Sequence, residues 1–409
     1  MPRIRLKTSF IILSVCLTMG VLRPVHADYE PQLQPASPQI LGQGGSGVAT
    51  ASGYSALFSN PAGFASPEGS LTFYTSTFWL YANPFRAFLA LVDSDSSALQ
   101  DFMEEELTAG GFGFGNADGA GYVGRGFGVG GLITIDTYAW GSTTGTASGD
   151  LVVTLAFIGG YAYPFKIKDS VIKVGADIRP MIRIRAPVDH PTLVDFIDAL
   201  QSDANPLATL NSADALHGTA LAIDLGVIVE SGGLRWGLAV RDFLGTRFRY
   251  RQDPFGDILV SIRESFRFPK GGVSVDGYRV PMDISSGFAY DFDFGGSKVL
   301  TDLVVYWALS DLVTVVLEDR PPASLLHAGA ELELYKRWKL RAGFNQGYLT
   351  LGTGISVWLL DFNLAFFSRE MGTLSDSRSN PGMSLEVAFR RDSERAGGRR
   401  KSDRRERER

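Results

Sequence analysis

Residues that often carry catalysis are scarce in this sequence of 409 residues. After the first 27 residues the histidines are His190, His217 and His327, and no Ser/His/Asp constellation or His/Cys metal-ligand spacing accompanies them. The glycine run at residues 111–115 is not followed by Gly-Lys-Ser/Thr, and no helix is expected to begin there. We interpret this run as small residues in a wall or turn. The sequence therefore predicts no enzyme, no metal site and no cofactor.

Charged residues form the best-marked candidate surface because they alternate with apolar residues. A strand sends successive side chains to opposite faces. In residues 171–185 one face carries Ile172, Val174, Ala176, Ile178, Ile182 and Ile184, and the other carries Lys173, Asp177, Arg179, Arg183 and Arg185. Alternation in other segments adds Asp224, Arg235, Arg241, Asp283, Asp291, Asp302, Glu331, Glu333, Arg341 and Glu386 to the charged face. One apolar and one charged face along most of the chain is typical of a membrane β-barrel.

These inward charges have two interpretations. They can pair with one another, which keeps the lumen hydrated and holds a plug in place. Alternatively, Arg183 and Arg185, at the outer end of their strand, can meet the carboxylate of an arriving ligand. The planar guanidinium suits that role because it binds a carboxylate through two parallel hydrogen bonds.

The alternation predicts an all-β fold, a transmembrane antiparallel barrel of about fourteen strands. The candidate strands are residues 70–82, 117–124, 127–140, 150–163, 171–186, 218–230, 234–247, 281–293, 298–309, 324–335, 338–346, 348–358, 361–370 and 381–390. If the chain begins in the periplasm, the long connections 83–116, 187–217 and 248–280 all fall on the extracellular side, as barrels of this kind require. The connection 248–280 is the weakest part of the count, because residues 256–268 could form an extra hairpin. Outward positions are expected at Leu234, Trp236, Leu238, Val240, Leu303, Val305 and Trp307, and Ala239 is expected to face the lumen.

The chain ends predict export. Residues 1–27 combine Arg3, Arg5 and Lys7, an apolar core and an A-x-A-like site ending at Ala27, which is the pattern of a cleaved signal peptide. Cys16 is the only cysteine and lies within it. Residues 28–69 are rich in Gly, Pro, Ser and Ala and are expected to form an N-terminal plug inside a barrel of residues 70–390. Residues 391–409 are expected to be a disordered basic tail in the periplasm. With both basic ends removed the body is acidic, which argues against a nucleic-acid partner.

Two long connections contain helical patterns. Residues 97–107 present Leu99, Phe102, Met103 and Leu107 on one face, and residues 192–200 present Leu193, Phe196, Ile197 and Leu200. These faces either cap the barrel by packing together or line an apolar access groove above Arg183 and Arg185. The two roles are compatible.

One segment resembles a known family. Residues 45–64 are similar to the hatch of the long-chain fatty-acid transporter family (FadL-like outer-membrane proteins), in which a Gly/Ala-rich run precedes an Ala and an Asn-Pro-Ala-Gly motif. Here these positions are Ala56, Asn60, Pro61, Ala62 and Gly63. Gly53, Tyr54 and Ser55 stand where many members have acidic residues. The stretches 327–331, 340–345 and 366–372 are similar to related barrels that include the type IX secretion shuttle proteins (PorV-like).

The resemblance implies a monomeric fourteen-stranded barrel, plugged by its N-terminus, that passes hydrophobic molecules sideways into the bilayer. The sequence thus predicts an outer-membrane transporter for hydrophobic or amphipathic compounds such as long-chain fatty acids. The alternatives are a secretion or surface-anchoring barrel, which would bind a protein partner, and a lipid-modifying barrel enzyme.

Overall fold

A computed structural model describes residues 33, 35–45, 47–92, 98–143, 146–189, 195, 209, 211–265, 267–269, 271–275, 278–294, 299–317, 320–371 and 379–392. The signal-like segment 1–27, the helical pattern at 192–200 and the tail 393–409 therefore lie outside the description, apart from single residues.

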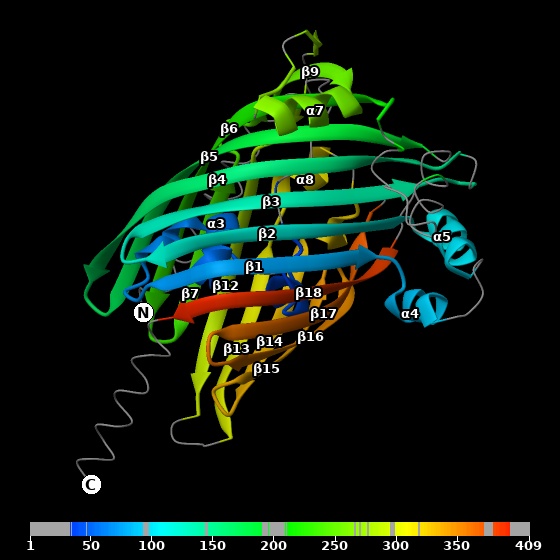
Figure 1. Cartoon of the computed structure of the whole chain (residues 1–409). Helices are drawn as coiled ribbons and strands as arrows, with labels where there is room; N and C mark the ends of the chain where they lie inside the picture. The colour runs from blue at the N-terminus through cyan, green and yellow to red at the C-terminus, as the bar shows by residue number, and fades with distance from the viewer. Residues whose placement is uncertain are drawn as a thin grey trace.

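Fourteen antiparallel strands of the described chain close into one ring (Figure 1). Each strand of the ring pairs with the next one along the chain, with β12 following β7 across an insertion, and the pairing of β1 with β18 closes the ring. The strands are β1 (Ser70–Tyr81), β2 (Phe112–Gly124), β3 (Phe127–Trp140), β4 (Ser148–Ile167), β5 (Ser170–Asp189), β6 (Asp214–Ser231), β7 (Leu234–Arg241), β12 (Asp283–Asp293), β13 (Leu300–Leu309), β14 (Leu326–Leu334), β15 (Trp338–Asn345), β16 (Tyr348–Val357), β17 (Leu360–Glu370) and β18 (Ser379–Asp392). The predicted barrel and its strand number are confirmed.

The wall is much taller on one side than on the other. Strands β4 and β5 have 20 residues each, whereas β7 and β15 have 8 each. Most tight turns lie at one end of the ring, here called the turn end, and the long connections lie at the other, here called the loop end. The strand predicted at residues 117–124 is too short, because β2 begins at Phe112, where glycines interrupt the polar-apolar alternation.

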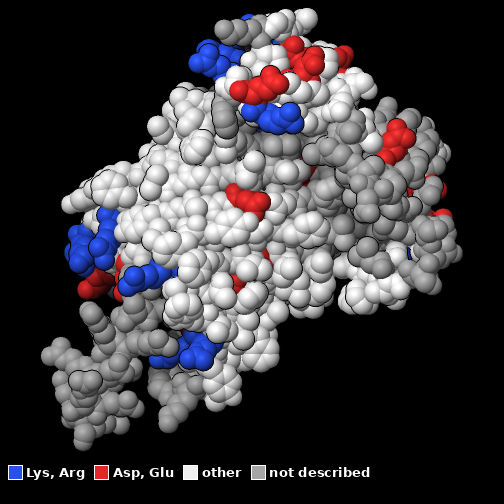
Figure 2. Space-filling view, in the orientation of Figure 1, with Lys and Arg blue, Asp and Glu red and all other residues white. Residues whose placement is uncertain are grey.

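The outer face is apolar and the inner face is polar. Ile178, Leu221, Val305, Trp307 and Leu351 are among many large apolar side chains exposed on the outside. Figure 2 shows a broad surface with few charged side chains on the side of the barrel that faces the viewer. The inner face buries charged side chains such as Arg179, Asp224 and Glu386. Such a wall places lipid outside and polar groups inside. Among the described helices, none is long and apolar enough to cross a membrane.

The connection after β7 differs from the sequence prediction. Residues 256–268 do not form an extra hairpin; α7 (Phe255–Ser265) occupies most of them, because Phe255 and Ile258 bury one helical face. Short strands flank the helix: β8 (Thr246–Arg247), β9 (Arg249–Pro254), β10 (Val273–Val275) and β11 (Arg279–Val280). β9 pairs with the loop-end part of β6, from Asp214 to Thr219, and β7 pairs with its turn-end part. The seam between them is interrupted at residues 242–245, where Asp242 and Leu244 have positive φ.

The segment from Leu33 to Ala65, here called the inner segment, lies inside the ring. It consists of α2 (Pro38–Gly42), η1 (Gly53–Ser55), α3 (Ala56–Ser59) and η2 (Pro61–Ala65). Figure 1 shows α3 behind β1 to β3, within the barrel. Its short helices pack on wall strands from both halves of the chain: η2 on β4 to β6, and α2 on β15 to β17.

Further helices stand at the loop end. They are α4 (Pro84–Val92), α5 (Ala98–Ala109), α8 (Leu312–Leu317) and η5 (Pro322–Leu325). The helix predicted at residues 97–107 thus exists as α5. It lies against the outer face of β2, where Phe102 and Phe112 meet edge to face with 6.2 Å between their centroids.

Candidate functional site

Asn60 connects the inner segment to the wall. Its side-chain nitrogen donates to three carbonyls: Val48 O at 2.9 Å within the inner segment, Leu238 O at 3.2 Å on β7, and Val227 O at 3.3 Å on β6. Its side-chain oxygen accepts from the backbone N–H of Ala62 at 3.0 Å and so caps η2, which begins with Pro61. Only an amide side chain supplies donors and an acceptor together in this shape.

Small wall residues allow the inner segment to come this close. A Cβ at Gly175 of β5 would lie 2.4 Å from the Pro61 carbonyl oxygen, and a Cβ at Gly237 of β7 would lie 2.3 Å from that of Val48. Gly63 is constrained from the other side, since a Cβ there would lie 2.4 Å from Ala51 O. The structure therefore places the predicted hatch residues Asn60, Pro61, Ala62 and Gly63 fully inside the ring, in backbone contact with β5 to β7.

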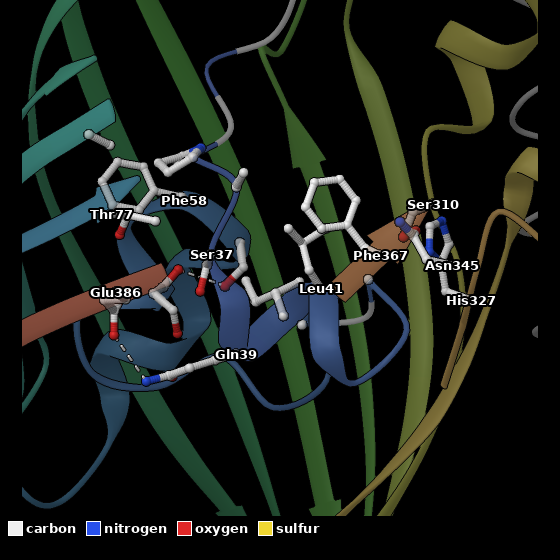
Figure 3. Close-up of a pocket in the computed structure, with 18 of the residues that line it drawn as sticks. Ser37, Gln39, Leu41, Phe58, Thr77, Ser310, His327, Asn345, Phe367 and Glu386 are labelled. Atoms are coloured by element: carbon white, nitrogen blue, oxygen red, sulfur yellow. Dashed lines mark hydrogen bonds between the residues drawn. The ribbon is translucent and has the colours of Figure 1, made fainter. Parts of the chain in front are cut away.

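A cavity of about 130 Å³ remains between the inner segment and the wall. Apolar side chains supply most of its surface: Ile40, Leu41, Val48, Tyr54 and Phe58 from the inner segment, and Tyr81, Ala117, Leu132 and Phe367 from the wall. In Figure 3, Leu41 and Phe367 lie between two groups of polar side chains. The cavity is thus an apolar slot with a polar group at either end.

The first polar group surrounds Glu386 of β18. The Glu386 carboxylate accepts from Arg390 Nη2 at 2.8 Å, from Asn363 Nδ2 at 3.1 Å and from Gln39 Nε2 at 3.4 Å. Gln39 belongs to α2, so this carboxylate joins the inner segment to the wall. Nearby, the buried Thr75 hydroxyl has no hydrogen-bond partner among the described residues.

The second polar group contains His327 of β14. The Gly44 carbonyl lies 3.0 Å from His327 Nδ1, and the cavity also reaches Ser310, Asn345 and Arg369. His327 Nε2 is buried and unpartnered within the described part of the chain. No described group of three or more His, Cys, Asp or Glu side chains is arranged to hold a metal ion.

The slot follows strand β1. Its lining includes Thr75, Thr77 and Tyr81, whose side chains all point inward. Tyr81 is six positions after Thr75, which corresponds to roughly 20 Å along a strand. The residues that line the cavity therefore extend over a length of the wall beside the inner segment.

A buried charge cluster lies at the interrupted seam. Arg179 of β5 is fully buried and forms salt bridges with Asp224 at 3.0 Å and with Asp242 at 3.2 Å. Asp224 also accepts from the Asp242 backbone N–H at 2.8 Å, and Asp242 accepts from the Thr246 hydroxyl at 2.8 Å. These bonds hold the bend at residues 242–245 in place.

The two arginines predicted to meet a ligand are paired within the protein. Arg183 is buried, donates from Nε to the Thr154 hydroxyl at 3.0 Å, and lies 4.6 Å from the centroid of the Phe248 ring. Arg185 forms a salt bridge with Asp150 at 2.6 Å. Both face the inside near the loop end, as predicted, but the described residues that line the cavity do not include them.

Of the access groove predicted from the two loop helices, the structure describes only the α5 side. Phe102 and Met103 are buried between α5 and the outer face of the wall, together with Phe112, Ala139 and Leu151. They therefore cover the wall. The side chain of Leu99, and the residues Leu193, Phe196, Ile197 and Leu200, lie outside the described part of the chain.

Sequence reasoning missed the cavity residues. Alternation placed Glu386 on the inner face, but it gave no reason to single out Ile40, Phe58 or Phe367. The inner segment has no periodic pattern, and which wall residues it faces depends on contacts across hundreds of residues. The one available signal was the motif at residues 60–63, which marks where the segment meets the wall.

Comparisons with known proteins show similarity in fold. No protein-family model matches the chain, and no curated protein matches it. Among solved structures, the CymD monoaromatic hydrocarbon channel is similar with a TM-score of 0.48 at 12% identity, over 88% of this chain and 98% of that chain. The Ralstonia pickettii toluene transporter TbuX has a TM-score of 0.46 at 13% identity, over 88% of this chain and 99% of that chain.

A Pseudomonas aeruginosa FadL homologue is similar with a TM-score of 0.44 at 11% identity, over 88% of this chain and 98% of that chain.

Proposed function

We propose that this protein is an outer-membrane channel that lets small hydrophobic compounds pass the wall of a plugged barrel. The observation that carries the proposal is the apolar slot beside the inner segment. A lipid-facing ring filled by its own N-terminal segment leaves little room for an aqueous pore, so a ligand must fit the space that remains. Apolar walls favour apolar ligands, at about 0.8 kcal/mol for each CH₂ group removed from water.

The volume of the slot limits the ligand. A cavity of about 150 Å³ with apolar walls accepts benzene, and this cavity measures about 130 Å³. A long-chain fatty acid has roughly three times as many non-hydrogen atoms as benzene. We therefore propose single-ring or short-chain compounds as ligands of this conformation. A long acyl chain requires that part of the inner segment moves away from the wall.

The polar groups of the slot suit a ligand with one weakly polar end. The Thr75 hydroxyl and His327 Nε2 are buried and lack partners among the described residues. A ligand hydroxyl that bonds to either one removes the cost of leaving it unsatisfied. The Glu386 carboxylate already has its ion pair and hydrogen bonds without a ligand, so a ligand carboxylate gains less there.

The experiment measures toluene binding to detergent-solubilised protein. Ala117 of β2 is buried and lines the cavity, so Ala117→Leu fills part of it. We expect toluene affinity to fall at least tenfold in this variant. Ala120→Leu is the matched control, because Ala120 lies on the same strand but is exposed outside. If the two variants bind toluene equally well, or if the unchanged protein does not bind it, the slot is not the ligand site.

A further inference from the structure

Helix α4 presents an apolar stripe away from the rest of the protein. Phe85, Phe88, Leu89 and Val92 are 73%, 64%, 64% and 61% exposed. Their spacing of three, one and three residues places all four on one helical face. The stripe includes no charged residue, and Figure 2 shows this part of the surface as uncharged.

Contacts with α5 fix the direction in which the stripe points. The buried Glu106 of α5 accepts from the Asn83 backbone N–H at 3.1 Å and from Arg86 Nη1 at 3.2 Å. Glu105 also pairs with Arg86. Ala87 is buried on the same side, next to the cluster that α5 forms with the wall. The polar side of α4 therefore faces α5, and the apolar stripe faces outward.

The stripe is continuous with the lipid-facing surface of the barrel. Phe85 stacks on Phe366 of β17, with 5.9 Å between ring centroids and 11° between planes. Phe366 pairs in register with Leu351 of β16, which is 51% exposed on the outside. Leu349, two residues closer to the loop end, is 60% exposed. The apolar outer surface thus extends past the level at which α4 touches the wall.

We propose that α4 lies within the loop-end half of the bilayer, with its stripe against lipid acyl chains. A helix of this kind binds by burying its apolar face at the boundary between headgroups and acyl chains. Here the barrel brings the helix to that depth, and the Arg86–Glu106 pair keeps its charge away from lipid. This inference needs only that the barrel spans a membrane; it holds whether or not the slot passes a ligand.

The test uses the full chain with Cys16→Ser and one new cysteine, labelled with an environment-sensitive fluorophore and reconstituted in phosphatidylcholine vesicles. Phe88→Cys reports on the stripe. Thr108→Cys is the matched control, because Thr108 is exposed on α5 but lies outside the stripe. Quenching is measured with lipids that carry a spin label on the acyl chain and with aqueous iodide.

We expect the acyl-chain quencher to act at least threefold more strongly on the label at position 88 than on that at 108, and iodide to show the reverse order. Strong iodide quenching at position 88 overturns the proposal, since it shows a water-exposed stripe. Energy transfer between labels on separate molecules is also measured, at one protein per vesicle or more. The proposal is overturned if dilution of the protein in lipid abolishes both this transfer and the protection of position 88 from iodide. That result shows that a second copy covers the stripe. Heat-dependent migration in detergent gels confirms that both variants are folded.

Discussion

At the scale of single residues, the inner segment packs closely against the wall because the wall has glycines, which lack side chains, at the points of contact. Gly175 leaves room for the backbone of Pro61. A Cβ added at Gly175 would meet backbone atoms, which cannot move aside as a flexible side chain could. Asn60 then needs only one rotamer to reach carbonyls on both β6 and β7. The Asn-Pro-Ala-Gly motif and the wall glycines therefore form one contact between the inner segment and the wall, here called the joint.

Gly175→Ala is expected to weaken this joint by roughly 1–3 kcal/mol, the usual cost of overpacking a closely packed interior. The barrel itself should remain folded, while the inner segment becomes more sensitive to protease added on the turn-end side. Gly159→Ala is the control, because a Cβ at Gly159 of the neighbouring strand β4 meets no atom within 4 Å. Equal protease sensitivity of the two variants would contradict the assigned contact.

Residue patterns in the sequence identified only the inner-segment residues of this joint and not their partners in the wall. The motif at residues 60–63 stood out, but its partner glycines are common in barrel walls and carry no signal of their own. The same limit applies to the slot. Gly44 and His327 lie 283 residues apart in the chain and meet in the structure. No local pattern predicts that contact, because it results from the closure of the whole ring.

At the scale of elements, alternation predicts strands well where one face meets lipid. The predicted strand 127–140 has the same bounds as β3. Prediction fails where another element covers the wall: α5 lies on the outer face of β2, and the connection 248–280 forms α7 with short strands around it. In both places the outer surface meets protein, so the lipid-facing pattern is no longer required.

The register of β7 is tested by Leu238→Arg. Leu238 points outward, and an arginine near the bilayer midplane costs roughly 2–4 kcal/mol. Ala239 is on the lumen face, but it packs on Val48 and Ala308 and leaves no room for an arginine. The better control is Ser285→Arg. Ser285 is on β12, pairs with Ala239 of β7 and lines the cavity. Denaturant unfolding in lipid vesicles measures both; equal losses of stability would show that the register is wrong.

At the scale of the whole molecule, the ring closes without help from the inner segment. The β1–β18 and β6–β7 pairings join wall strands directly. The inner segment therefore fills a lumen that exists independently of it, and the proposed function assigns it the role of a plug.

Deletion of residues 35–66 should thus give a folded barrel that makes vesicles permeable to glucose, whereas the full chain should not. Heat-dependent gel migration verifies that the shortened barrel is folded. A folded but impermeable variant would show that side chains of the wall block the lumen by themselves.

The unequal strand lengths have a consequence for the surrounding membrane. Strands of 20 residues on one side, such as β5, and of 8 residues on the other, such as β15, present two different hydrophobic thicknesses to one bilayer. Lipid adapts to a short hydrophobic wall by thinning and to a long one by thickening or tilt of the protein, at a cost of fractions of a kcal/mol per ångström. The bilayer beside β14 and β15 should therefore be thinner and less ordered than that beside β4 and β5. The barrel carries a permanent weak point of the bilayer along one side of its circumference.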